Sequence, residues 1–314
     1  MHTTKRSVFA VVTIMLLGFF TETPAADEIV PVIRTRELGT VSDGFTQPSD
    51  VVAGTNKRIY VLDGVNNRVS VFRDSGELLF SFGKEGTGAG SFRSPLGIGI
   101  DELNRIYVAD SGNHRIQVFS PDGSYQYQLA TDAGGRCSRP SDPTDVVVNL
   151  KTQRCYVADN DNHCVHIFNL ENRMPVKDCG RMGMEENEFR FPFMLDRDRA
   201  GNIYVVEVIN TRVKMLDTEG AFIRNIGSWG VEPGELYRPK GVAVDAGGRI
   251  FVSDGYLGVV QAFAADGAFL GVVGNEQGEV ASFKTPAGIF IDGSMRLYVV
   301  ESLANRLKIL EILK

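Results

Sequence analysis

The stretch that decides the fold is Pro95-Leu-Gly-Ile-Gly-Ile-Asp101, followed by Arg105-Ile-Tyr-Val-Ala-Asp110 and Asn113-His-Arg115-Ile-Gln-Val-Phe119. Short apolar runs alternate with turn residues, and apolar residues nowhere keep a helical spacing over several turns. Runs of this length that are bounded by Gly, Asn and Asp are typical of β-strands. We therefore expect short antiparallel strands here.

Three landmarks of this stretch recur six times in one phase. The first is a proline, at intervals of 47 to 49 residues: Pro48, Pro95, Pro143, Pro192, Pro239 and Pro286. The second is a strand of the Ile-Tyr-Val type. The third is an acid two positions later: Asp63, Asp110, Asp159, Glu207, Asp254 and Glu301. A fixed period of this size indicates a solenoid or a propeller, and four short strands per period favour a propeller.

The last repeat stops after its third strand, so its fourth strand must come from elsewhere. In the first repeat the fourth strand is expected at residues 77–82, and the same offset before Pro48 gives residues 30–35. Gly39 also matches the glycine nine residues before later prolines. The sequence therefore predicts an all-β, six-bladed propeller of four-stranded antiparallel blades over residues 29–314, whose last blade is closed by the N-terminal strand.

The first 25 residues have the pattern of a secretory signal peptide. Lys5 and Arg6 precede an apolar run over residues 8–20, and Ala25 and Ala26 offer a small-residue cleavage site. An uncleaved anchor is the alternative, but the run is shorter than the ~20 residues of a spanning helix. We expect a periplasmic or secreted protein with no transmembrane segment after cleavage.

Composition excludes two broad classes. The 314 residues are 43% hydrophobic and 23% charged, which excludes bulk disorder. The net charge is −6, which argues against nucleic acid as a partner because such binders need clustered Lys and Arg. The 34 glycines fit a chain with many tight turns.

The repeat resembles the NHL repeat, in which Pro-x-Gly-hydrophobic is followed by Ile-Tyr-Val-x-Asp and Asn-x-Arg-hydrophobic. The resemblance extends from about residue 30 to residue 314 and is clearest over residues 95–119. It implies a six-bladed propeller. Relatives of this kind include RNA-binding and substrate-binding modules, extracellular sensors, a peptide-amidating lyase and, more distantly, lactonases, so it implies no single function.

Antiparallel connectivity places the blade connectors and the loops between second and third strands on one face, where ligands of similar propellers usually bind. The residue two positions after each proline is usually Gly, and Asp50, Asp145 and Met194 depart from this. Capping of local N–H groups is the alternative role for the two Asp residues. The candidate binding residues on this face are Asp50, Asp145, Phe193, Met194, Lys240, Tyr256, His114 and His163.

Tyr256 marks the loop where the fifth repeat departs from the others. Tyr256-Leu-Gly-Val259 replaces a polar loop by an aromatic and aliphatic tip, which suggests a partner contact, with lateral packing as the alternative. The recurring acids precede Arg by five residues in four repeats, so a scaffold role with exposed ion pairs is expected for them.

No complete catalytic set is visible in the sequence. A lyase of the amidating type needs zinc on three histidines near the axis, and none of His114, His163 and His166 follows a repeat proline. A lactonase needs oxygen ligands around a hard cation, for which Asp50 and Asp145 alone are insufficient. We therefore expect no cofactor or metal, and a non-enzymatic binding, scaffold or sensor propeller for a protein, peptide or glycan. The alternative is a metal-dependent hydrolase or lyase.

All four cysteines lie in or beside the third repeat. An even number in an exported chain favours disulfides. Hairpin counting places Cys164 almost opposite Cys179, so this pair is the expected disulfide, with Cys137 as the competing partner. Cys155 occupies an apolar strand position and is expected to be a buried thiol.

Overall fold

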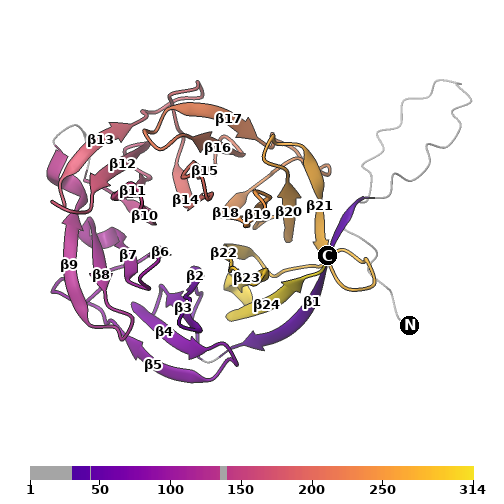
Figure 1. Ribbon diagram of the computed structural model, residues 1–314, viewed down its shortest axis with the longest axis horizontal. Helices are drawn as coiled ribbons and strands as arrows, with labels where there is room; N and C mark the ends of the chain where they lie inside the picture. Colours follow the sequence, from indigo (N-terminus) through magenta and orange to yellow (C-terminus); the bar gives the residue numbers. More distant parts are fainter. Residues whose placement is uncertain (1–29, 43, 135–139) are drawn as a thin grey trace, which may run out of the picture.

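The strands form a ring of sheets around a central axis, with the first strand of each blade innermost (Figure 1). The computed structural model describes residues 30–42, 44–134 and 140–314. Blades one and two are β2 (Asp50–Ala53), β3 (Arg58–Asp63), β4 (Arg68–Arg73), β5 (Leu78–Phe82), β6 (Gly97–Ile100), β7 (Ile106–Asp110), β8 (Arg115–Phe119) and β9 (Tyr125–Ala130). Blades three and four are β10 (Pro143–Asn149), β11 (Arg154–Asp159), β12 (Cys164–Asn169), β13 (Pro175–Cys179), β14 (Pro192–Arg197), β15 (Ile203–Glu207), β16 (Arg212–Leu216) and β17 (Phe222–Ile226).

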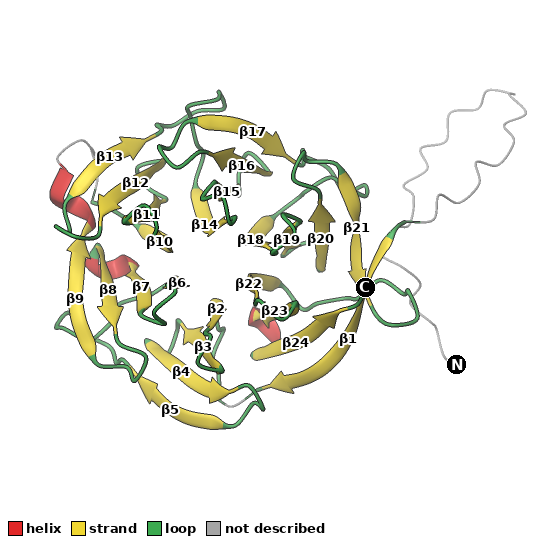
Figure 2. Cartoon of the chain, viewed as in Figure 1, coloured by secondary structure: helices red, strands yellow, loops and turns green. Residues whose placement is uncertain are grey.

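Blade five is β18 (Pro239–Val244), β19 (Ile250–Asp254), β20 (Val259–Phe263) and β21 (Phe269–Gly274); blade six is β22 (Pro286–Ile291), β23 (Arg296–Glu301), β24 (Arg306–Ile312) and β1 (Val32–Val41). Single 3-10 turns lie at η1 (Ser111–Asn113), η2 (Thr131–Gly134) and η3 (Ser302–Ala304) (Figure 2). No helix in the described ranges is long and apolar enough to cross a membrane. The predicted all-β, six-bladed architecture is confirmed.

Each second strand lies at the centre of its blade and is covered on both faces. Every residue of β7 and of β19 is buried, whereas the outer strand β9 is mostly exposed. The tyrosine of the Ile-Tyr-Val landmark is fully buried in five blades, and in blade two its hydroxyl donates to Asp101 across the hairpin at 3.1 Å. A large ring with a satisfied hydroxyl packs neighbouring blades together without leaving a buried polar atom unpaired.

The recurring acids hold each incoming connector. All six are fully buried, and each accepts the backbone N–H of the residue seventeen positions earlier. Those donors are Thr46, Arg93, Asp142, Arg190, Tyr237 and Lys284. In four blades the acid also pairs with the Arg five residues later. The scaffold role was expected, but the expectation of exposed pairs was wrong, because the carboxylates lie inside the blades.

β1 closes the ring, although not at the predicted residues. Thr35–Val41 pairs antiparallel with β24, while Val32–Arg34 pairs parallel with β21, so blades five and six share one eight-stranded sheet. The offset from Pro48 was wrong because the connector after β1 is shorter than the one after β5. Gly39 lies at a bulge inside β1, not in a connector.

Candidate functional site

Two carboxylates on inner strands, Asp50 and Asp145, line the channel and join neighbouring blades. Asp50 accepts the N–H of its own neighbour Val51 at 2.8 Å and that of Ile98 in blade two at 2.9 Å. Asp145 does the same between Val146 and Leu195, both at 2.7 Å. Both side chains are buried. Each Asp thus caps backbone donors across a blade boundary, which was the alternative role considered from the sequence.

The glycines at the equivalent positions make room for these carboxylates. A Cβ on Gly97 would lie 2.4 Å from Oδ1 of Asp145, and one on Gly288 would lie 2.1 Å from Oδ1 of Asp50. Real Cβ atoms do not approach an oxygen so closely. Blades one and three thus have Asp where the repeat usually has Gly, and the Gly at the same position of the preceding blade leaves room for each Asp side chain.

A third channel carboxylate, Asp196 on β14, was missed by the sequence reasoning. It accepts the N–H of Arg197 at 2.7 Å and that of Val244 in blade five at 2.6 Å. Burial raises the pKa of Asp196 to about 6 and that of Asp50 to about 7, and it also raises the pKa of Asp145. Repulsion between the three carboxylates adds to the effect at Asp50 and Asp145. The buried channel therefore makes ionisation of these three carboxyl groups less favourable than it is in water.

The channel is narrow at the level of these acids and widens toward the opposite face. A cavity of about 50 Å³ lies among the inner strands, with Asp50, Asp145, Met194 and Asp196 in its wall. A hollow of about 570 Å³ lies beyond it, at the turns between first and second strands. The inner cavity has room for a few water molecules but not for an organic substrate.

The remaining channel-face candidates of blades four and five divide into buried and half-buried groups. Met194 is buried in the core between these blades, so it is not displayed at the channel mouth. Lys240 is half-buried, its Nζ lies 4.9 Å from the centre of the Phe193 ring, and burial lowers the pKa of its ammonium. Lys240 and Phe193 thus form a cation–π pair next to the channel.

The two loop histidines contact the adjacent connectors rather than one another. His114 lies at the end of η1 with a φ of 54°, and its Nδ1 is hydrogen-bonded to the carbonyl oxygen of Ser141. In blade three, Nδ1 of His163 accepts the N–H of Phe191 at 3.2 Å, and the two rings meet edge to face at 4.6 Å.

Exposed apolar side chains gather at the loops between second and third strands. Tyr256, at 64% exposed, stacks on Tyr237 with ring centroids 4.4 Å apart. The same loop position is exposed and apolar in three further blades, and these four residues are called the apolar rim: Val65, Ile209, Tyr256 and Leu303. They belong to blades one, four, five and six, which follow one another around the ring (Figure 1). The equivalent residues of blades two and three are Gly112 and Asp161.

The expected disulfide between Cys164 and Cys179 was wrong. The residue paired with Cys179 across the sheet is Val165, so Cys164 is offset by one position and its side chain points to the other face. Among the described residues Cys155, Cys164 and Cys179 are free thiols. Cys155 is buried, as expected, and burial raises the pKa of its thiol. Cys137 lies outside the described residues.

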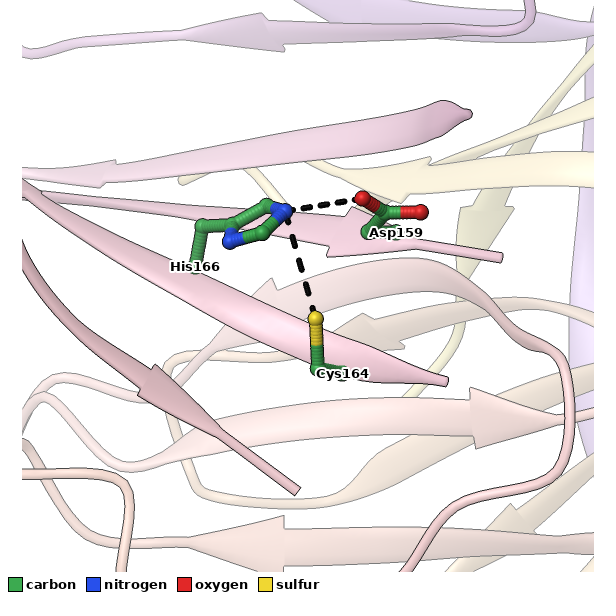
Figure 3. A group of neighbouring side chains, drawn as sticks. All are labelled: Asp159, Cys164 and His166. Carbon is green, nitrogen blue, oxygen red and sulfur yellow. Dashed lines mark hydrogen bonds and ion pairs between the residues drawn. The ribbon is translucent and has the colours of Figure 1, made fainter. Parts of the chain in front are cut away.

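Cys164 instead belongs to a buried cluster in blade three, which Figure 3 shows. Nε2 of His166 is 2.8 Å from Oδ2 of Asp159 and 3.9 Å from Sγ of Cys164. Nδ1 of His166 is 2.8 Å from Oδ1 of Asp178 on β13. Although burial acts in the opposite direction, the bonds to Asp159, Asp178 and Cys164 raise the pKa of His166 to about 12.

Asp159, Cys164 and His166 are the one group of His, Cys, Asp and Glu in the described ranges whose ligand atoms lie close enough together for a metal ion. The channel acids Asp50 and Asp145 form no such group. The sequence reasoning did not connect Asp159 with Cys164 and His166. The available signal was that Cys164 and His166 follow the recurring acid Asp159 by five and seven residues.

Two family models match parts of the chain. The DUF5128 family, described as a 6-bladed beta-propeller, matches residues 21–138, and the NHL repeat matches residues 141–168. No curated protein matches the sequence significantly.

Solved structures similar to this chain share its fold at low sequence identity. A protein of unknown function from Bacteroides thetaiotaomicron is 16% identical with a TM-score of 0.68, over 90% of this chain and 73% of that one. A gluconolactonase from Xanthomonas campestris is 18% identical with a TM-score of 0.66, over 90% and 97%. A virginiamycin B lyase from Staphylococcus aureus is 13% identical with a TM-score of 0.59, over 84% and 80%. The chain therefore has the fold of a six-bladed β-propeller, and parts of its sequence match the models of a 6-bladed beta-propeller family and of the NHL repeat.

Proposed function

We propose that this protein is a non-enzymatic binding propeller whose partner is a protein or peptide and docks on the face that carries the apolar rim. The rim is the observation that carries the proposal, because exposed apolar side chains that gather on one face of a folded protein mark interaction sites. Tyr256 and Leu303 are 64% and 67% exposed. Both line a hollow of about 480 Å³ together with Phe283 and Lys284.

The connectors on the same face carry further exposed apolar side chains. Trp229, in the connector between blades four and five, is 71% exposed, and Met182 and Met184 are exposed in the connector before blade four. Trp, Tyr and Met are enriched in the cores of protein interfaces. The contacts of the channel acids with backbone N–H groups support binding over catalysis, because both oxygens of each carboxylate already serve the scaffold.

A site-specific photo-crosslinking experiment tests this proposal. A photoreactive amino acid at Tyr256 should give a defined crosslinked adduct in living cells, and the Trp229→Ala variant should reduce the adduct severalfold. The matched control is the same amino acid at Ser294, which lies in a turn between first and second strands on the opposite face. Equal crosslinking from both positions would contradict the proposal. Metal-dependent turnover of a lactone or peptide that is lost in Asp50→Asn would favour the enzymatic alternative.

We also propose that residues 1–25 direct export, so that the partner is met in the periplasm or outside the cell. The charged start and short apolar run of the sequence support this. N-terminal sequencing of the protein from cell fractions is the test. A chain that retains Met1 in the cytosolic fraction would contradict it.

A further inference from the structure

Blade three lacks the cation that four other blades place beside the recurring acid. Five residues after the acid, four blades carry an Arg: Arg68, Arg115, Arg212 and Arg306. In blade three the same position is Cys164. Two residues further on, blade two has Gln117, whose Nε2 donates to Asp110 at 2.9 Å, whereas blade three has His166. A thiol and an imidazole thus replace a guanidinium and an amide around a buried carboxylate.

We propose that Asp159, Cys164 and His166 form a binding site for one zinc ion or a similar thiophilic divalent cation within blade three. Three ligand atoms of the types that zinc prefers lie on one face of the hairpin β11–β12 (Figure 3). Zinc bonds of about 2.0–2.3 Å in tetrahedral geometry place such ligand atoms roughly 3.3–3.7 Å apart. The observed N···O and N···S separations of 2.8 and 3.9 Å lie on either side of that range, so small side-chain rotations suffice.

The second ring nitrogen of His166 is oriented as in a metal site. Histidine ligands usually donate their other N–H to a carboxylate, which fixes the ring and the tautomer. Nδ1 of His166 lies 2.8 Å from Oδ1 of Asp178, so Nε2 is left to face Asp159 and Cys164. This arrangement orients the imidazole toward the point where the three ligand atoms converge.

Charge balance supports a divalent cation at this point. Asp159, Cys164 and His166 are all buried. As metal ligands, a carboxylate, a thiolate and a neutral imidazole would together carry two negative charges, which the charge of a dication would offset. The Cys and His ligands favour zinc, cobalt or copper over magnesium or calcium, which prefer all-oxygen sites. A water molecule would supply the fourth ligand.

Cobalt(II) is the probe that tests this site, because thiolate ligation gives it an intense charge-transfer absorption in the near ultraviolet. The full chain, produced with cobalt during folding and kept reduced, should carry one cobalt per chain by elemental analysis and show this band. The same preparation with zinc should carry one zinc and lose thermal stability when EDTA removes the ion.

The repeat itself supplies the best control variant. Cys164→Arg with His166→Gln recreates the Asp110, Arg115 and Gln117 set of blade two, so it should fold and lose both the metal and the charge-transfer band. Cys155→Ser alters a buried thiol outside the cluster and should keep both. If the double variant does not fold, Cys164→Ser should retain at most weak cobalt binding without the thiolate band. A wild-type chain without stoichiometric metal, or a band that survives Cys164→Ser, would overturn the proposal, and neither result bears on the apolar rim.

Discussion

Replacing Asp110 by Asn should destabilise the whole ring, because this carboxylate joins four donors from three parts of blade two. It accepts a hydrogen bond from the backbone N–H of Arg93 at 2.7 Å. It also accepts hydrogen bonds from side-chain N–H groups of Asn113, Arg115 and Gln117 at 2.8–3.0 Å. The isosteric amide keeps one acceptor and turns an NH2 group toward these donors. Removing one partner of a buried ion pair costs about 3–5 kcal/mol, and the backbone bond to the connector is weakened as well.

We therefore expect Asp110→Asn to lower the free energy of unfolding by about 4 kcal/mol and the Tm by roughly 10 °C. Urea unfolding followed by circular dichroism and scanning calorimetry measure the two quantities. The matched control is Asp122→Asn in the same blade, since Asp122 lies in the exposed turn before β9 and should leave the Tm nearly unchanged. Equal urea midpoints for the two variants would refute the view that the recurring acids hold the connectors.

Three further outcomes are expected. Gly288→Ala should lower the Tm by several degrees because the added Cβ would overlap the carboxylate of Asp50. Gly293→Ala is the control and should leave the Tm unchanged, because no atom lies within 4 Å of its added Cβ. Equal melting curves for the two variants would argue against this steric reason. Burial raises the pKa of Asp196 to about 6. The contribution of its protonated form to the free energy of unfolding is therefore complete below about pH 4 and is lost as the pH rises through 6. The fall in unfolding free energy from pH 4 to 8 should shrink by about 3 kcal/mol in Asp196→Asn, and a profile parallel to the wild type would count against this. Removing residues 1–41 should expose two strand edges and cause self-association in light scattering; a stable monomer would contradict the closure by β1.

The fold was predictable because its landmarks are the parts that hold a blade together. The acid of each repeat binds a connector residue just before the repeat proline, seventeen positions earlier in every blade, so the proline and the acid keep nearly the same spacing throughout. Closure by the N-terminal segment was predictable from the missing fourth strand. Its register was not, because β1 leaves β24 and continues along β21, an arrangement that no other blade has.

The candidate site was harder to predict from the sequence than the fold, because it depends on the direction in which each side chain points. Counting along the hairpin brought Cys164 close to Cys179, but an offset of one residue in a strand moves a side chain to the other face. Asp196 was missed because it lies four residues after Pro192, beyond the positions directly after the repeat prolines. At the same position of the other five repeats, four residues after the proline, the sequence has Val, Gly, Val, Ala and Phe. A single acid among these residues was the signal that could have found Asp196.

The shared sheet of blades five and six joins two segments that lie far apart in the sequence. Thr35 pairs with Ile312, so the ring cannot close until β24 has been made. Bringing together the ends of a loop of this length costs roughly 5 kcal/mol of chain entropy, which only the completed ladder repays. We expect closure to be the last and slowest folding step, during which a partly formed ring presents open edges to chaperones. In a circular permutant, a linker joins the original ends of the chain, near β1 and β24, and new ends are opened elsewhere. Such a variant should fold faster than the protein with the natural order.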